Sequence, residues 1–166
     1  MQEHRRDQSA KAVAGLVITS DTRTPETDET GRAALKLLEE AGHTVAAYVM
    51  IGNEVGKIKE ALEGLLLDKR IQVIITSGGT GIGPRDKTVD AISSLLERRI
   101  EGFGELFRRL SYEEIGVASM MSRATAGITK GKVVFCLPGS RGAMEMALKE
   151  IILPSLGHML WELGRE

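Results

Sequence analysis

The sequence has few of the residues that build disulfide-bonded or metal-centred structures. It contains one cysteine and three histidines in 166 residues. One cysteine cannot form an internal disulfide, and the three histidines lack the mutual spacing of metal ligands. Cys136 lies in an apolar run, where a small buried side chain is expected. The composition therefore excludes a disulfide-stabilised domain and a zinc site built from cysteine.

The chain also lacks long apolar runs and an excess of charge of either sign. No segment reaches the roughly 18 uninterrupted apolar residues that a membrane-spanning helix requires, and the first residues contain no apolar stretch typical of a secretion signal. The 22 basic and 23 acidic residues leave a net charge of −1, so no overall field attracts nucleic acid or an acidic membrane. We therefore expect a cytoplasmic protein that binds neither nucleic acid nor membrane.

Strand and helix patterns alternate along the chain in a way that fits one domain. Residues 1–14 are polar and aperiodic, which predicts a flexible arm, and residues 15–166 predict a single α/β domain. Apolar, β-branched runs at 15–20, 44–51, 71–75 and 132–137 predict buried strands, with helical patterns after each. This alternation predicts a mostly parallel central sheet covered on both faces, a three-layer α/β/α sandwich.

The glycine-rich segment TSGGTGIGP at 76–84 is the most informative part of the sequence. It follows a predicted strand and precedes a helical pattern, but it fits neither the P-loop, which requires lysine at 84, nor the dinucleotide fingerprint. Glycines let a ligand approach the main chain, and amides at a helix start favour anions. The segment predicts a phosphate-binding loop formed by Ser77, Gly78, Gly79, Thr80 and Gly81. The alternative is a glycine-rich turn required only by tight strand-to-helix packing.

Asp86 stands at the junction between this loop and the following helix. An aspartate at a helix start commonly caps it, stabilising it by about 1 kcal/mol. A carboxylate beside a bound phosphate would instead be repelled unless a divalent cation lay between them, which is how nucleotide enzymes usually hold Mg²⁺. The residues alone leave both roles open for Asp86.

Two other strand ends carry side chains suited to ligand binding. The strand at 15–20 leads to Asp21, and the next helix starts near Asp28, which either caps it or contacts a ligand. The strand at 132–137 ends in a second tight turn, formed by Pro138, Gly139 and Ser140. Since the carboxyl ends of parallel strands meet at one edge of a sheet, the turns and the glycine-rich loop predict a two-walled cleft.

Three further patterns concern the second half of the chain. Apolar spacing predicts a helix over 88–99, and Pro154 is expected to interrupt the last helix. Phe103, Phe107 and Leu110 fall on one helical face, which favours core packing or a subunit interface over a cofactor pocket.

Several sequence blocks now point to one family. They are TSGGTGIGPRD at 76–86, TSDTR at 19–23, DETG at 28–31, SRATAGI at 122–128 and LPGS at 137–140. With them the chain, from about residue 15 to 160, resembles the MoaB/MogA family of molybdenum cofactor biosynthesis proteins, which is related to the gephyrin G domain. The block EGFGELFRRLSYEEIG at 101–116 is more similar to MoaB than to MogA.

The resemblance implies a MogA-like three-layer α/β/α fold, a trimer or hexamer, and binding of molybdopterin and a nucleotide. Active members of the family adenylylate molybdopterin with Mg-ATP and release pyrophosphate. For this chain the resemblance implies Mg²⁺ binding by Asp86, and phosphate and pterin binding by the glycine-rich loop and by the Pro138 to Ser140 turn.

The chain departs from the family pattern at Asn53. Many members carry an aspartate after a proline here, implicated in the active site, whereas this chain has Gly52, Asn53 and Glu54. Asparagine brings no charge to help hold Mg²⁺, and Glu54 is the candidate to replace the missing carboxylate. The resemblance as a whole still implies a molybdopterin adenylyltransferase, and this is the expectation. The alternative is a catalytically silent protein of the same fold that binds molybdopterin and a nucleotide.

Overall fold

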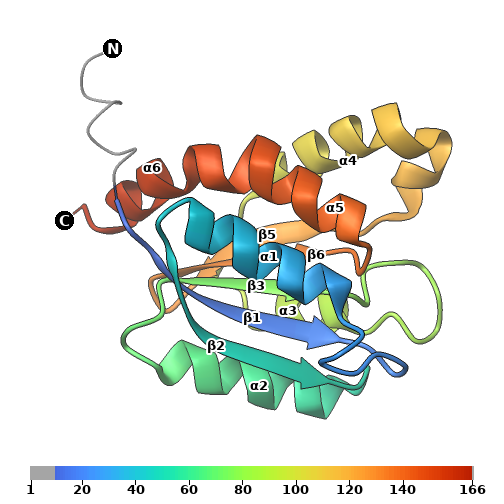
Figure 1. The fold of residues 1–166 in the computed structure, drawn as a ribbon, viewed down its shortest axis with the longest axis horizontal. Coiled ribbons are helices and arrows are strands. Elements are labelled where there is room, and N and C mark those ends of the chain that lie inside the picture. The colour runs from blue at the N-terminus through green and yellow to red at the C-terminus, as the bar shows by residue number, and fades with distance from the viewer. Residues whose placement is uncertain (1–9, 166) are drawn as a thin grey trace.

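The fold, described by a computed structural model for residues 10–165, is a six-stranded sheet between two layers of helices (Figure 1). In chain order the elements are β1 (Val13–Thr19), α1 (Glu29–Glu40), β2 (Thr44–Ile51), α2 (Val55–Leu67), β3 (Val73–Ser77), α3 (Thr88–Ser93), β4 (Arg98–Arg99), α4 (Glu101–Ile115), η3 (Gly116–Met121), β5 (Thr125–Thr129), β6 (Lys132–Leu137), α5 (Arg141–Met146), η4 (Ala147–Ile152) and α6 (Leu153–Leu163). The flexible arm predicted for residues 1–14 lies mostly outside the described residues. Its last residues do not fit the prediction, because Ala12 is buried and Val13 already pairs with β2.

The strand order is β2-β1-β3-β6-β5-β4. The pairs β2·β1, β1·β3 and β3·β6 are parallel, whereas β6·β5 and β5·β4 are antiparallel. The predicted mostly parallel sheet is thus confirmed. The parallel strands that matter most for function are β3 and β6, because they are neighbours and both end at the same edge.

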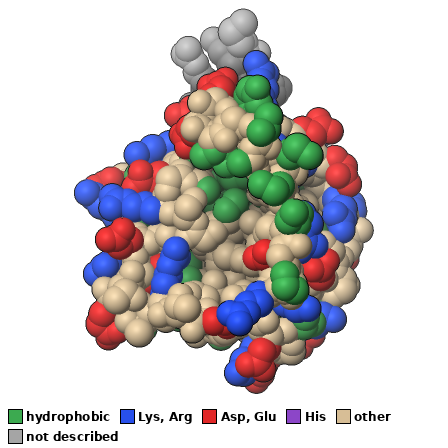
Figure 2. Space-filling model, turned by 90° about the vertical axis from the view of Figure 1, so that its right-hand side faces the viewer, with side chains coloured by type: hydrophobic (Ala, Val, Ile, Leu, Met, Phe, Trp, Pro, Cys, Tyr) green, Lys and Arg blue, Asp and Glu red, His purple; other side chains and the backbone are tan. Residues whose placement is uncertain are grey.

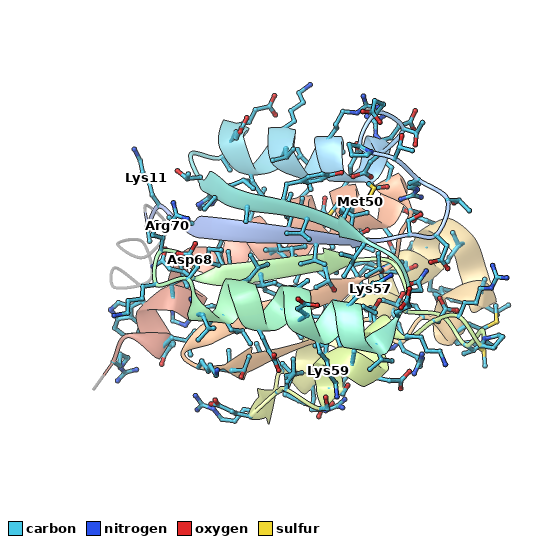
Figure 3. The ribbon with its side chains drawn as sticks, turned by 90° about the horizontal axis from the view of Figure 1, so that it is seen from below. Lys11, Met50, Lys57, Lys59, Asp68 and Arg70 are labelled. Atoms are coloured by element: carbon cyan, nitrogen blue, oxygen red, sulfur yellow. The ribbon has the colours of Figure 1, made fainter. Side chains whose placement is uncertain are left out.

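Alternation along the strands separates the core into two layers. Val73, Ile75 and Phe135 face one cluster of buried side chains, and Ile74 and Val134 face the other. Helices α1, α4, α5 and α6 cover the first face and α2 and α3 the second (Figure 1). Seen from below, α2 crosses its face with Lys57 near one end and Asp68 and Arg70 near the other (Figure 3). The predicted three-layer sandwich is therefore confirmed.

The helix predicted over 88–99 is wrong in its second half. Helix α3 ends at Ser93, and the chain then extends to form β4, whose flanking amides at Glu97 and Ile100 donate to carbonyls of β5 at 2.9 Å. Strand β5 itself was not predicted. A two-residue turn joins it to β6, with positive φ at Lys130 (48°) and Gly131 (71°), the backbone that a tight hairpin requires.

The aromatic stripe of α4 faces inward. Phe103 and Phe107 are 3% and 0% exposed, and the Phe103 ring lies 5.2 Å from that of Phe135 in the central sheet. Core packing, the first of the two predicted roles, is therefore the one observed, and these two rings cannot form a subunit interface. Further along the chain, Ile115, Val117 and Met120 are among the exposed large hydrophobic residues.

Pro154 does not interrupt the last helix. The helical path runs from α5 through η4 into α6, and the turn before the proline is widened, with the Leu153 amide donating to the carbonyl of Leu148. A widened turn accommodates the missing proline amide and the proline ring without ending the helix.

The loop after β3 has a backbone that only glycine adopts easily. Gly78 and Gly79 have φ of 103° and 69°. A Cβ at Gly78 would lie 2.3 Å from the carbonyl oxygen of Thr19, and one at Gly79 would lie 2.2 Å from the hydroxyl of Thr88. Tight packing against β1 and α3 therefore accounts for both glycines, which was the alternative interpretation of this segment.

We predict that Gly79→Ala lowers the free energy of unfolding by at least about 2 kcal/mol. A left-handed backbone costs an L-residue roughly 1–2 kcal/mol, and the new methyl would clash with Thr88. The matched control is Gly64→Ala in α2, where a Cβ meets nothing within 4 Å and helix propensity should add about 0.5–1 kcal/mol. Chemical denaturation measures both. Equal changes in the two variants would contradict the assigned backbone strain.

A second prediction concerns acid stability through His43, whose Nδ1 accepts a hydrogen bond from the Ala12 amide at 3.0 Å. Burial lowers the pKa of His43 below its ordinary value of 6.5, so the unfolded chain takes up the proton first as pH falls. The stabilisation that neutral His43 contributes is fully present above the ordinary pKa of 6.5, and it is lost as pH falls from there toward the lowered pKa of the folded protein. The stability advantage of the wild type over His43→Gln should therefore shrink between about pH 7.5 and about pH 5. Parallel stability curves would contradict this.

Candidate functional site

One cavity of about 460 Å³ lies at the carboxyl ends of β3 and β6. Figure 2 shows this end of the molecule, which is hollowed near its centre and bordered by a curved row of hydrophobic side chains. The lining comes from the glycine-rich loop, the β6–α5 turn, the last turns of α4 and the end of η3: Gly79, Thr80, Gly81, Asp86, Ser111, Glu114, Ile115, Met121, Ser122, Pro138, Gly139, Ser140, Gly142, Ala143 and Met146. The predicted two-walled cleft is thus present.

The two walls are joined at their base. The Gly78 amide donates to the carbonyl of Leu137 at 2.9 Å, and the Ser77 hydroxyl donates to the carbonyl of Pro138 at 3.1 Å. A Cβ at Gly139 would lie 3.4 Å from the Cα of Gly78. Ser77 and Gly78, both predicted to bind ligand, therefore do not line the cavity but connect its walls.

The first wall presents backbone donors to the cavity. Within the described part of the chain, the amides of Gly79, Thr80 and Gly81 have no hydrogen-bond partner, and all three residues line the cavity. Successive free amides in a turn form a concave anion site. Helix α3 contributes less than predicted, because it has only 6 residues and its dipole is correspondingly small. The loop itself is therefore the part suited to phosphate.

Asp86 lines the same cavity but does not cap α3. The residue before that helix is Lys87, and the Asp86 carboxylate instead accepts the Gly83 amide through Oδ2 at 2.9 Å. A Cβ at Gly81 would lie 2.7 Å from Oδ2, so that glycine makes room for the carboxylate. Oδ1 has no partner among the described residues and remains available to a cation or a donor.

The second wall is held from below by the loop between β1 and α1. The Gly139 carbonyl accepts Arg23 Nη1 at 2.8 Å and the Thr30 hydroxyl at 2.9 Å. Asp28 lies beneath them, fully buried, and its carboxylate accepts the Gly31 amide at 2.9 Å and the Tyr48 hydroxyl. Burial, followed by the bond to Asp28, raises the pKa of Tyr48. Asp28 thus caps α1, one of its two predicted roles, and does not line the cavity.

Ser140, predicted to bind ligand, caps a helix at the edge of the cavity. Its hydroxyl oxygen caps α5 by accepting the Ala143 amide at 3.2 Å. A hydroxyl that accepts in this way can still donate its own proton. Ser140 lines the cavity beside Pro138 and Gly139, so this turn offers a donor next to an apolar surface.

Asp21 and Asn53 form a separate pair outside the cavity lining. Asp21 accepts the Asn53 backbone amide at 3.0 Å and its side-chain amide at 3.2 Å. The bond from the Asn53 backbone is the main reason that the pKa of Asp21 lies below its ordinary value. Glu54 pairs with Lys57 at 2.6 Å. Neither Asn53 nor Glu54 lines the cavity with Asp86, so a carboxylate at 53 would face Asp21 rather than Asp86.

Residues that the sequence did not single out complete the cavity. Ser111, Glu114 and Ile115 come from the last turns of α4, and Met121 comes from the end of η3. Ser111 and Glu114 continue the face of α4 that carries Phe103 and Phe107, which is buried on the sheet nearer the start of the helix. Their signal was helical spacing that continues the buried stripe into the last turns of α4.

Asp86 fits a magnesium ion that is held mostly by substrate. No cluster of three or more carboxylate, histidine or cysteine side chains that could hold a metal occurs within residues 10–165. Mg²⁺ commonly binds through one or two carboxylates together with substrate phosphates and water, and Asp86 beside free loop amides offers that arrangement. No helix in the same range is both long and apolar enough to cross a membrane.

Comparison with known proteins agrees with this geometry. A family model described as "Probable molybdopterin binding domain" matches residues 15–158. The chain is 45% identical to molybdenum cofactor biosynthesis protein B of Bacillus anthracis, covering 99% of this chain and 98% of that protein. Among solved structures, a molybdenum cofactor biosynthesis protein B matches with a TM-score of 0.92 at 45% identity, covering 95% of this chain and 98% of the other.

A third relative is more distant but has the same fold. The molybdopterin biosynthesis enzyme MoaB of Thermus thermophilus matches with a TM-score of 0.81 at 31% identity, covering 92% of this chain and 96% of the other. The family match at residues 15–158 spans both walls of the cavity, and the structural similarity to MoaB covers 92% of the chain. The chain therefore belongs to the molybdopterin-binding family of molybdenum cofactor biosynthesis proteins, and within it to the MoaB group.

Proposed function

We propose that this chain binds molybdopterin and Mg-ATP in the cavity and transfers AMP to the terminal phosphate of the pterin. The observation that supports this most directly is one cavity lined by both the free amides of the glycine-rich loop and the Asp86 carboxylate. Phosphate oxygens and a divalent cation need these two kinds of group side by side.

In the proposed reaction the substrate phosphate is the nucleophile. One of its oxygens forms a bond to the α-phosphorus of ATP while the bond from that phosphorus to the bridging oxygen breaks, and pyrophosphate leaves with the electron pair. No protein nucleophile is needed. The chain binds and aligns the two phosphates through the amides of Gly79, Thr80 and Gly81, which point donors at the charge that develops. When bound at Asp86, Mg²⁺ would withdraw negative charge from the phosphates.

The two ends of the cavity suit different parts of the substrates. Glu114 is exposed, lines the cavity, and pairs with no other described residue. A free carboxylate repels phosphates but accepts well from the adjacent amino and ring N–H groups of a pterin. Ile115, Met121 and Met146 supply apolar surface for a flat ring nearby. We assign the pterin ring to this end and the nucleotide phosphates to the glycine-rich loop.

The alternative is a protein that binds molybdopterin without adenylylating it. It is suggested by the departure from the family pattern at Asn53, which lies outside the cavity lining and donates its side-chain amide to Asp21. Incubation of the purified protein with molybdopterin, Mg²⁺ and ATP separates the two functions. Adenylylated pterin would support the enzyme, whereas tight pterin binding without product would support the silent binder.

We also propose that the chain forms a trimer or hexamer. Ile115, Val117 and Met120 are 57%, 74% and 78% exposed at the end of α4 and in η3, and a group of large exposed apolar side chains is typical of an interaction surface. Sedimentation at micromolar concentration tests the oligomer, and a monomer would contradict it.

Asp86→Asn should reduce metal-dependent turnover by at least about a hundredfold, because a carboxylate that holds Mg²⁺ contributes several kcal/mol to charge stabilisation. Folding should change little, since the asparagine carbonyl can still accept the Gly83 amide. Product formation is measured together with thermal unfolding. A large loss of melting temperature would show that Asp86 is needed for the fold instead.

Glu114→Gln should weaken molybdopterin binding roughly tenfold to hundredfold, the effect of losing a charged acceptor, and should leave ATP binding unchanged. The matched control is Glu113→Gln, the exposed neighbour that does not line the cavity. Fluorescence titration with the pterin measures both affinities. Equal affinities for the two variants would remove Glu114 from the pterin site.

A further inference from the structure

Arg123 makes an unusual set of contacts with the outer side of the glycine-rich loop. Its Nε donates to the Gly81 carbonyl at 2.8 Å and its Nη2 to the Asp86 carbonyl at 2.9 Å. Its Nη1 pairs with Asp90 of α3 at 2.9 Å. Its backbone amide also donates to the Thr80 carbonyl, at 2.7 Å. Three of these four bonds go to backbone carbonyls of the loop, and one goes to a carboxylate.

These bonds determine which way the loop presents its amides. The chain has no cis peptide bond within the described residues, and in a trans peptide the carbonyl and the following N–H point in opposite directions. Because Arg123 does not line the cavity, holding the Thr80 and Gly81 carbonyls on its side turns the amides of Gly81 and Ile82 the other way. For Gly81, which lines the cavity, that direction is toward the cavity.

The same guanidinium also fixes the backbone of Asp86. Within the loop, Asp86 bonds only Gly83: its carboxylate accepts the Gly83 amide, and its own amide donates to the Gly83 carbonyl at 3.1 Å. A planar guanidinium can bond three acceptors at fixed angles, which a lysine ammonium does not reproduce. The side chain is 35% exposed, so it is partly shielded from water and its bonds are correspondingly stronger.

We propose that Arg123 is the positioning residue of the phosphate-binding loop. It contacts no substrate, and it acts by holding the Gly81 and Asp86 carbonyls so that the loop amides and the Asp86 carboxylate keep the geometry needed for transfer. The role in turnover rests on the proposed function, whereas the role in loop order does not.

The test compares Arg123→Ala, Arg123→Lys and Asp90→Asn with a control, Arg70→Ala. Arg70 also forms an ion pair, with Asp68 at 2.7 Å. It precedes β3, whereas the glycine-rich loop follows β3, and it lies at the opposite end of the sheet from Lys57 (Figure 3). Amide hydrogen exchange over residues 78–87 and over β3 and β6 measures loop order. Steady-state kinetics with molybdopterin, ATP and Mg²⁺ measures kcat and KM, and added guanidinium ion tests for rescue.

In Arg123→Ala, exchange of the hydrogen-bonded loop amides of Gly83 and Asp86 should rise at least about tenfold, while β3 and β6 stay protected by their own strand pairing. The value of kcat should fall about a hundredfold, the scale expected for misplaced groups, and guanidinium ion should restore part of it. The kcat of Arg123→Lys should lie between those of the wild type and Arg123→Ala. Asp90→Asn should change kcat by less than about threefold, as expected for an exposed ion pair. Arg70→Ala should behave like wild type.

Normal loop exchange in Arg123→Ala would overturn the proposal. So would faster exchange spread equally over β3 and β6, which would mean a role in the whole fold. A wild type that makes no adenylylated pterin would contradict the proposed enzyme only, because loop exchange and molybdopterin affinity still test Arg123. In that case Arg123→Ala should bind molybdopterin at least about tenfold more weakly than Arg70→Ala does.

Discussion

The site depends on how closely the ends of β3 and β6 approach each other. The two strands are parallel neighbours, and the amide of Gly78 continues their pairing by one more hydrogen bond, to Leu137. A side chain at Gly78 would clash with the Thr19 carbonyl, and a Cβ at Gly139 would lie in van der Waals contact with the Cα of Gly78. Because the walls meet at their base, their outer parts enclose a cavity that neither loop could form alone.

Each wall is then held by an arginine from another part of the chain. Arg23 bonds the carbonyl of Gly139 in one wall, and Arg123 bonds the carbonyls of Gly81 and Asp86 in the other. In both cases a charged donor satisfies backbone acceptors on the outer side of a turn, which leaves amides free on the inner side. Glycine is the most flexible residue in a turn, and these two side chains each hydrogen-bond to the backbone of one of the turns.

Much of the architecture followed from period-two and helical patterns. The four parallel strands, α1, α2 and the cavity between the ends of β3 and β6 were predicted, since buried strands read as apolar runs whatever their neighbours. The short pieces were not. Strands β4 and β5 form only because Arg98 and Arg99 pair with β5, and β5 pairs with β6 across a two-residue turn. Such pairing depends on contacts too distant to appear in a local pattern.

The residue types at the site were determined by the sequence itself: glycines, a carboxylate at 86, and a second turn with Ser140 all stand where strands end. Only the tertiary structure decided which of them face the cavity. Asp28 points into the core because Tyr48 and Gly31 bind it there, and Asn53 turns to Asp21 rather than to Asp86. Glu114 enters the site because it continues the face of α4 that Phe103 and Phe107 bury on the sheet. A side chain's chemistry is encoded locally, but its direction is set by packing partners that lie far away in the sequence.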